Sequence, residues 1–244
     1  GKLLELKTYA DDAVAKAKVA EFAAPLEELK KTVVGSSSVV LDGERTNVRA
    51  KETNLGNLIA DSMAQKANEL VPGTTIAMQN GGGIRASIDQ GDVTLGEIHT
   101  VMPFANLLVT LDLTGEEIWQ ALEHSVSKVE AGEGRFMQVS GLQFKYDAAK
   151  PALDRVWSVN VKTTDGYEPL DMTKTYSVAT NAFVADGGDG YTVFKKAKTE
   201  GRIHELLIVD YEILTGYLEK NSPVAPTVEG RIVAAQAKPA TPTV

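Results

Sequence analysis

The sequence contains no cysteine and only three histidines among its 244 residues. The absence of cysteine excludes disulfide bonds, thiolate metal sites and a cysteine nucleophile. The histidines, His99, His124 and His204, lie far apart, and none stands beside another histidine. A hydrolytic metal centre needs several clustered histidine and aspartate ligands. The chain is therefore predicted to be a binding domain rather than a complete hydrolytic enzyme.

The sequence also lacks a surplus of basic residues and any long apolar run. It has 25 Lys and Arg against 33 Asp and Glu, a net charge of −8. This balance argues against non-specific nucleic-acid binding, which needs basic surface to displace counterions, but it permits a local basic pocket. No apolar run approaches the about 20 residues that a membrane-spanning helix needs. The hydrophobic content of 43% is typical of a globular protein.

Several catalytic and binding motifs are missing as well. No glycine-rich stretch ends in the Gly-Lys-Ser/Thr of a phosphate-binding P-loop, and no Gly-x-Gly-x-x-Gly follows a strand. The Gly-x-Ser-x-Gly elbow of serine hydrolases is absent. Asp186 and Asp189 stand three apart, whereas an EF-hand places its ligands at every second residue, which argues against calcium.

The most informative stretch that is present is 79–85, Gln-Asn-Gly-Gly-Gly-Ile-Arg. It follows a short apolar run, 75–78, that is predicted to be a buried strand. Three consecutive glycines imply either positive φ angles or the close approach of another backbone or a ligand. Arg85 would present a planar, permanently charged fork suited to phosphate or carboxylate. The alternative is a tight structural turn followed by a surface arginine.

Four further side chains are candidates for ligand contact. Arg45 and Arg49 are four apart and could face one pocket, or could be a solvated surface pair. Phe104 follows a proline, and Phe183 precedes a second glycine cluster at 187–190. Core packing is the alternative role for both phenylalanines. Their positions in loops favour ligand contact.

The pattern of apolar residues predicts an α/β fold with a mixed sheet flanked by helices. Residues from about 9 to 34 form an amphipathic helix with one apolar stripe. This helix is either a connector between domains or an ordinary packed helix, and we favour the connector. Short strands dominate from about 136 to 180. We expect a linker helix at 1–35, a substrate-binding domain at 36–235 and a disordered tail at 236–244.

Three motifs carry a resemblance to a known family. Residues 80–85, the segment 102–106 with its Met-Pro-Phe and Asn106, and residues 183–191 together resemble the C-terminal domain of the 5'-nucleotidases. That family includes the periplasmic UDP-sugar hydrolases and the ecto-5'-nucleotidases. The resemblance covers roughly residues 36 to 220, with the motifs in the family's order. The long N-terminal helix resembles the one that links the two domains of these enzymes.

The resemblance implies a role for each candidate residue. Two phenylalanines sandwich the base, an asparagine and an aspartate contact base and ribose, and arginines hold the phosphate or the ribose. A glycine near the start of a strand loosely matches one that lies close to the base. The implied binding residues are Arg45, Arg49, Asn80, Arg85, Phe104, Asn106, Gly141, Phe183 and Asp189.

The resemblance also implies what lies outside this sequence. In such enzymes an N-terminal metallophosphatase domain holds two divalent metal ions and performs the hydrolysis, and those ligands are not in this chain. We therefore expect no cofactor here, binding of nucleosides or nucleotides, and no hydrolysis by this chain alone. The start at Gly1 suggests a cut inside a longer protein. The resemblance implies a periplasmic or extracellular location. Self-association through the stripe at 15–33 is a further expectation. The alternative is an interaction module whose nucleotide pocket is vestigial.

Overall fold

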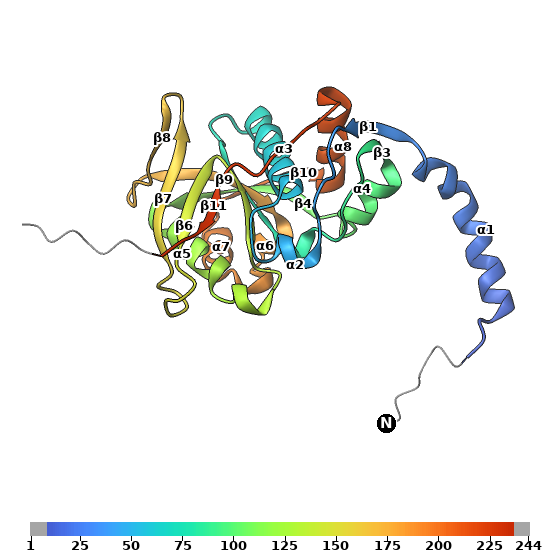
Figure 1. Ribbon diagram of the computed structural model, residues 1–244, viewed down its shortest axis with the longest axis horizontal. Helices are drawn as coiled ribbons and strands as arrows, with labels where there is room; N and C mark the ends of the chain where they lie inside the picture. The colour runs from blue at the N-terminus through green and yellow to red at the C-terminus, as the bar shows by residue number, and fades with distance from the viewer. Residues whose placement is uncertain (1–8, 237–244) are drawn as a thin grey trace, which may run out of the picture.

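The main feature of the fold is a five-stranded mixed sheet with helices on both faces (Figure 1). The computed structural model describes residues 9–236. The expected disordered tail lies, apart from residue 236, outside the described residues. The strands of this sheet, in spatial order, are β10 (Ile203–Val209), β4 (Leu107–Thr114), β9 (Thr175–Asn181), β2 (Ile76–Asn80) and β5 (Met137–Ser140). β2 and β9 are parallel, and the other pairs are antiparallel. The α/β architecture with a mixed sheet is confirmed.

Side chains of the central strands alternate between the two faces of the sheet, and the hydrophobic interior therefore consists of two cores. Ile76 and Met78 of β2 face one core, and Ala77 faces the other, as the two-residue period of a strand requires. The first core is covered by α5 (Gly115–Val126), α6 (Ala182–Ala185) and α7 (Thr192–Thr199). The second is covered by α3 (Asn54–Leu70), α4 (Leu95–Val101) and α8 (Asp210–Asn221). Both faces of the central strands are therefore buried.

Two smaller sheets and several short helical turns complete the fold. A four-stranded sheet has the order β11 (Ile232–Ala234), β6 (Leu142–Tyr146), β7 (Val156–Thr163) and β8 (Gly166–Pro169). A two-stranded sheet pairs β1 (Val33–Ser37) with β3 (Gly91–Thr94). The short turns are α2 (Arg45–Val48) and the 3₁₀ turns η2 (Gly81–Gly83), η3 (Val129–Ala131) and η4 (Gly188–Gly190). The segments η2 and η4 are the two glycine clusters.

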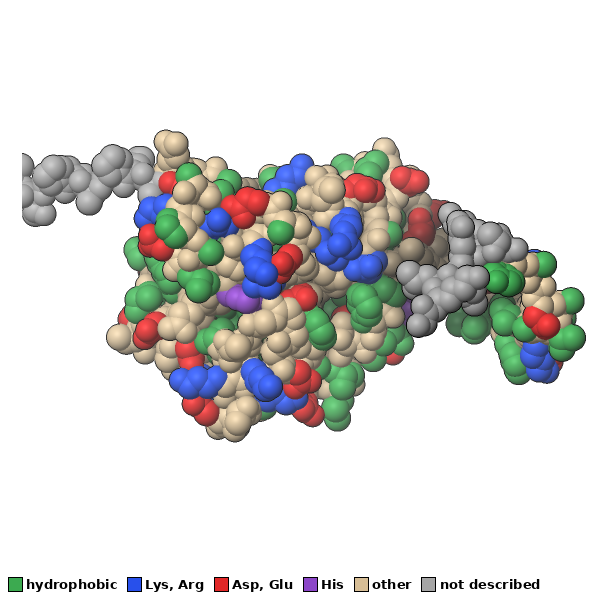
Figure 2. Space-filling view, turned by 90° about the horizontal axis from the view of Figure 1, so that it is seen from below, with side chains coloured by type: hydrophobic (Ala, Val, Ile, Leu, Met, Phe, Trp, Pro, Cys, Tyr) green, Lys and Arg blue, Asp and Glu red, His purple; other side chains and the backbone are tan. Residues whose placement is uncertain are grey.

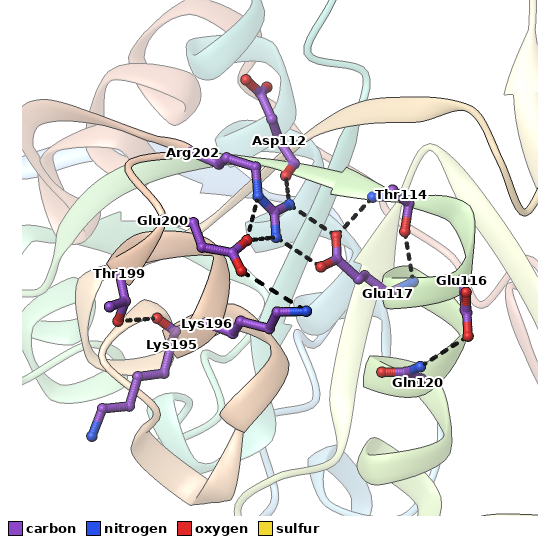
Figure 3. A network of polar contacts seen from close by, with 10 residues as sticks. All are labelled: Asp112, Thr114, Glu116, Glu117, Gln120, Lys195, Lys196, Thr199, Glu200 and Arg202. Carbon is purple, nitrogen blue, oxygen red and sulfur yellow. Dashed lines mark hydrogen bonds and ion pairs between the residues drawn. The ribbon is translucent and has the colours of Figure 1, made fainter.

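A polar network fixes the start of α5 against the end of α7 (Figure 3). Thr114 and Glu117 form the capping box that their spacing predicts. The Arg202 guanidinium donates to both Glu117 carboxylate oxygens, at 2.9 and 2.7 Å, and to Glu200. Burial acts to raise the pKa of Glu117, but the hydrogen bonds from Arg202 and Thr114 outweigh it and hold that pKa below its usual range. The carboxylate therefore stays ionised inside the network.

The N-terminal helix α1 (Ala13–Lys30) stands away from the rest of the molecule (Figure 1). Hydrophobic side chains are exposed along this arm (Figure 2), among them Val19, Phe22 and Leu26. The helix ends at Lys30, before the predicted end at about residue 34. The chain after it forms β1, which pairs with β3. The first strand thus begins inside the range expected for the linker. Within residues 9–236 no helix is long and apolar enough to cross a membrane.

Candidate functional site

A cavity of about 420 Å³ opens where β2 ends, between the two glycine clusters. This volume is within the range of small-molecule sites, about 300–1,000 Å³. Seven of the nine predicted binding residues line it, together with three glycines. The lining residues are Arg49, Asn80, Gly82, Gly83, Arg85, Phe104, Asn106, Gly134, Phe183 and Asp189. Segments that are far apart in the sequence therefore meet at one cavity.

The triple glycine is required by close approach and not by backbone handedness. None of Gly81, Gly82 and Gly83 has a positive φ. A Cβ on Gly81 would lie 2.2 Å from the carbonyl oxygen of Val48, and one on Gly83 would lie 2.3 Å from the Gln79 amide nitrogen. The Gly82 N–H donates to the carbonyl of Gly134 at 2.9 Å. A side chain on Gly81 would clash with the backbone of Val48, and one on Gly83 would displace the buried amide of Gln79.

Asn80 and Asp189 join the two glycine clusters directly. The Asn80 amide donates to the Asp189 carboxylate at 2.7 Å, and the Asn181 amide donates to Asn80 Oδ1 at 3.0 Å. Asp189 has a φ of 53°, in the left-handed region. His124 donates from Nε2 to the Asp189 carbonyl at 2.9 Å, and burial lowers the pKa of His124 below its usual range. The neutral imidazole, which is not a lining residue, therefore holds the backbone of a residue that lines the cavity.

The two phenylalanines that line the cavity differ from those in the core. Phe104 and Phe183 are 55% and 45% exposed, whereas Phe136, Phe144 and Phe194 are at most 1% exposed. Core packing therefore does not account for Phe104 and Phe183. The Arg85 guanidinium lies 5.6 Å from the centre of the Phe104 ring, a cation–π distance. An exposed aromatic face is thus placed beside a cation at the same opening.

Three arginines, Arg45, Arg49 and Arg85, place positive charge at or near the cavity, whose lining has one carboxylate, that of Asp189. Arg49 is only 7% exposed, and its Nε has no hydrogen-bond partner among residues 9–236. Burial, and next the charges of Arg45 and Arg85, lower the pKa of Arg49. None of these three arginines forms an ion pair with a carboxylate within residues 9–236. Arg45 is exposed on α2 and does not line the cavity, although its charge reaches Arg49.

Gly141 is not part of this cavity, contrary to expectation. It joins β5 to β6 with a φ of 72°, and a Cβ there would lie 1.9 Å from the Thr75 carbonyl oxygen. The need for glycine at this turn is therefore structural. Gly134 lines the cavity instead, because the carbonyl of Gly134 pairs with Gly82. Little in the sequence indicated that Gly134 would line a cavity, because Gly132-Glu133-Gly134 looks like an ordinary turn.

The chemistry of the lining residues is that of recognition. The ten residues offer aromatic faces, guanidinium groups, amides and one carboxylate, and none is a serine, histidine or lysine. Within residues 9–236 no group of three or more His, Asp or Glu side chains is placed to hold a metal ion. The described residues therefore do not fit a two-metal hydrolytic centre. The cavity can hold a flat ring carrying an anionic or polyhydroxyl group.

Comparison with known proteins identifies the family. The family model "5'-nucleotidase, C-terminal domain" matches residues 33–196. The trifunctional nucleotide phosphoesterase protein YfkN of Bacillus subtilis is 49% identical over 220 residues, which are 89% of this chain and 15% of that protein. A snake venom 5'-nucleotidase of Macrovipera lebetinus is 35% identical over 240 residues, which are 93% of this chain and 58% of that protein.

A solved structure agrees with this assignment. The 5'-nucleotidase precursor of Thermus thermophilus superposes with a TM-score of 0.85 at 44% identity, over 95% of this chain and 45% of that one. The chain thus spans only part of each of these relatives. The matched residues 33–196 include β1, both glycine clusters and every residue that lines the cavity. The chain belongs to the family of 5'-nucleotidase C-terminal domains.

Proposed function

We propose that this domain holds the nucleoside part of a nucleotide substrate and works with a metal-bearing hydrolase domain of the same protein. The base stacks between Phe104 and Phe183, Asn106 and Asp189 contact base and ribose, and Arg49 and Arg85 hold the ribose or phosphate end. Arg45 adds charge at the rim. The observation that supports this most is the pair of exposed phenylalanines at a cavity beside arginines that form no ion pair with any carboxylate of residues 9–236.

The energies of such contacts suit a substrate that must bind and leave. Stacking of a base on an aromatic side chain contributes about 1–3 kcal/mol per base and tolerates any base. Hydrogen bonds from guanidinium groups to an anion are roughly twice as strong as neutral ones. Because Arg49 lines the cavity and forms no ion pair within residues 9–236, an anionic group of a ligand would supply its guanidinium with a counter-charge.

The whole protein is proposed to be a phosphoester hydrolase acting on nucleoside 5'-phosphates or UDP-sugars. The names of the relatives support this, since one is a nucleotide phosphoesterase and another a 5'-nucleotidase. Two divalent metal ions would belong to the other domain, and this chain alone would not hydrolyse its ligand. A periplasmic or extracellular location is proposed, in keeping with the venom relative and the absence of cysteine.

Calorimetric titration with adenosine, AMP and UDP-glucose tests the binding role. We expect saturable binding of at least one, and an affinity loss of about 5- to 150-fold on Phe183→Ala, because stacking on that ring is worth about 1–3 kcal/mol. Phe22→Ala is the matched control, since Phe22 is also exposed but lies on α1. Unchanged affinity of the Phe183 variant would remove that ring from the site. No heat with any ligand would favour an interaction module with a vestigial pocket.

A further inference from the structure

A buried glutamine that does not line the cavity holds the segment that carries Arg49. Gln138 lies on β5 and is 0% exposed. Its Nε2 donates to the carbonyl of Val48 at 3.0 Å and to the carbonyl of Lys51 at 2.8 Å. Its Oε1 accepts from the N–H of Thr53 at 3.0 Å. One side chain therefore makes three hydrogen bonds to the backbone on either side of Arg49.

These bonds take the place of those that regular secondary structure would supply. Residues 49–53, between α2 and α3, belong to neither a helix nor a strand. Buried backbone groups in such a segment need partners from side chains. The two carbonyls need donors and the N–H needs an acceptor, so only one orientation of the Gln138 amide satisfies all three. The path of the chain around Arg49 therefore depends on Gln138.

Glycines on two sides leave room for this arrangement. A Cβ on Gly56 would lie 2.3 Å from Gln138 Oε1, so the amide lies directly against the first turn of α3. A Cβ on Gly81 would lie 2.2 Å from the Val48 carbonyl oxygen, so the carbonyl that Gln138 holds lies directly against η2. Gln138 thereby connects β5, the segment of Arg49 and the glycine turn at the cavity.

The Arg49 side chain has few other contacts to place it. Within residues 9–236 its guanidinium makes one hydrogen bond, a long one of 3.4 Å from Nη1 to the carbonyl of Gly132, and no ion pair. The direction of the guanidinium is therefore set mainly by the backbone from which it projects. A hydrogen bond to a ligand weakens steeply as its angle departs from linear. A shift of this backbone would thus weaken the contact between Arg49 and an anion.

We infer that Gln138 is a positioning residue that makes this site prefer nucleotides to nucleosides, by holding Arg49 where its guanidinium meets the anionic group of the ligand. This inference rests on the proposed function, since it requires a nucleotide in the cavity. Stacking on Phe104 and Phe183 would act on the base, which a nucleoside and its 5'-phosphate share. The difference in affinity between the two ligands therefore reports on the anion-binding end of the site.

The ratio of the affinities for AMP and adenosine tests the inference. Calorimetry on this chain should show AMP bound about 10- to 150-fold more tightly, the range that one charge-assisted hydrogen bond gives. Gln138→Leu keeps a buried side chain of similar size and removes all three hydrogen bonds. It should lower the ratio at least about fivefold, the effect of one net hydrogen bond, and change the affinity for adenosine by less than about twofold.

Thr180→Val is the matched control for this variant. Thr180 is also 0% exposed, and its hydroxyl donates to a backbone carbonyl, that of Met78, at 2.8 Å. The substitution therefore also removes a buried hydrogen bond from side chain to backbone, at a position with no contact to the segment of Arg49. It should keep the wild-type ratio.

A second variant displaces the Gln138 amide without removing it, and so tests the inference even if Gln138→Leu does not fold. Gly56 lies inside α3 without a positive φ, where alanine has the higher helix propensity. The added Cβ of Gly56→Ala would meet the amide at 2.3 Å and push it away from its three partners, so the ratio should fall as in Gln138→Leu. Gly216→Ala is the control, because Gly216 lies in α8 with nothing within 4 Å of a Cβ there. It should keep the ratio.

A double-mutant cycle separates the positioning of Arg49 from a general loss of structure. Arg49→Ala should lower the ratio by itself. Adding Gln138→Leu should then lower it no further, because the group that Gln138 positions is already absent. A further fall of the ratio in the double variant would overturn the inference.

The remaining outcomes distinguish this inference from the proposed function. A ratio close to one in the wild-type chain, or a wild-type ratio in Gln138→Leu and Gly56→Ala, would overturn the role of Gln138 and leave the cavity a nucleotide site. Equal losses of affinity for AMP and adenosine would also overturn it, since Arg49 would then not act on the phosphate. Absence of binding of both ligands to the wild-type chain would overturn the proposed function, and this inference with it.

Discussion

The amide of Asn80 donates a 2.7 Å hydrogen bond to the carboxylate of Asp189, 109 residues further along the chain. This one contact ties the end of β2 to the second glycine cluster and closes one side of the cavity. A charge-assisted hydrogen bond in a partly buried place is worth about 1.5–3 kcal/mol. The geometry of the proposed ribose and base contacts therefore depends on a bond between two side chains of the site itself.

Asn80→Asp should disrupt this contact, because it replaces the donor by a second carboxylate facing the first. We expect adenosine affinity to fall at least about tenfold and the free energy of unfolding to fall by about 1–3 kcal/mol. Calorimetry and urea denaturation measure the two effects. Asn160→Asp on β7, in the other sheet, is the control. Wild-type affinity in the Asn80 variant would mean that the contact does not shape the site.

Local signals in the sequence were sufficient for several elements. Thr94 with Glu97 and Thr114 with Glu117 have the spacing of a capping box, a pattern visible in neighbouring residues alone, and both boxes are formed at the starts of α4 and α5. The apolar run at 75–78 predicted a strand, and β2 (Ile76–Asn80) lies there. These elements follow from the chemistry of neighbouring residues alone.

Elements that depend on distant partners could not be predicted in the same way. The strand β1 contains Gly35 and two serines, which have low strand propensity, and it forms because β3 is available to pair with it. The strand β10 carries a bulge with Leu207 at a φ of 55°, which breaks the alternating pattern. The choice between Gly134 and Gly141 at the cavity is set by how β5 pairs with β2. The N–H of Asp210 donates to the carbonyl of Asn106 on a distant segment, a contact that no local pattern predicts.

Glu117→Gln should destabilise the fold through the network of Figure 3. The neutral amide can still complete the capping box, but it cannot accept two charge-assisted hydrogen bonds from Arg202. We expect a loss of about 1–3 kcal/mol in the free energy of unfolding, measured by urea denaturation. Glu116→Gln, at an exposed neighbouring position, should change it by less than about 0.5 kcal/mol. If Glu117→Gln and Glu116→Gln changed the free energy of unfolding equally, the negative charge of Glu117 would not strengthen its hydrogen bonds with Arg202.

Asp210 should also make stability depend on pH in an uncommon direction for a carboxylate. Its pKa is raised from 3.8 to about 6 by burial, so between these values the folded state binds more protons than the unfolded state. The free energy of unfolding therefore falls as pH rises through this window. A pKa difference of about two corresponds to up to about 3 kcal/mol.

The comparison with Asp210→Asn isolates this contribution, since the amide does not titrate. We expect the stability of wild type relative to the variant to decline from about pH 4 to about pH 7 and to be constant above that range, by chemical denaturation at each pH. Glu212→Gln should show no such decline relative to wild type. A difference between wild type and Asp210→Asn that does not change with pH would place the pKa of Asp210 outside this window.

The exposed stripe on α1 should cause self-association. Val19, Phe22, Leu26 and Leu29 are each more than half exposed, and their spacing of three and four residues places them on one helix face. Contiguous exposed apolar surface of this kind marks an interaction site. We expect the sedimentation coefficient of the chain to rise with concentration, and the double change Phe22→Ser with Leu29→Ser to abolish the rise. Tyr167→Ser, at an exposed aromatic on β8, should not affect it. A strictly monomeric wild-type chain at high concentration would show that the stripe does not pair with a second copy.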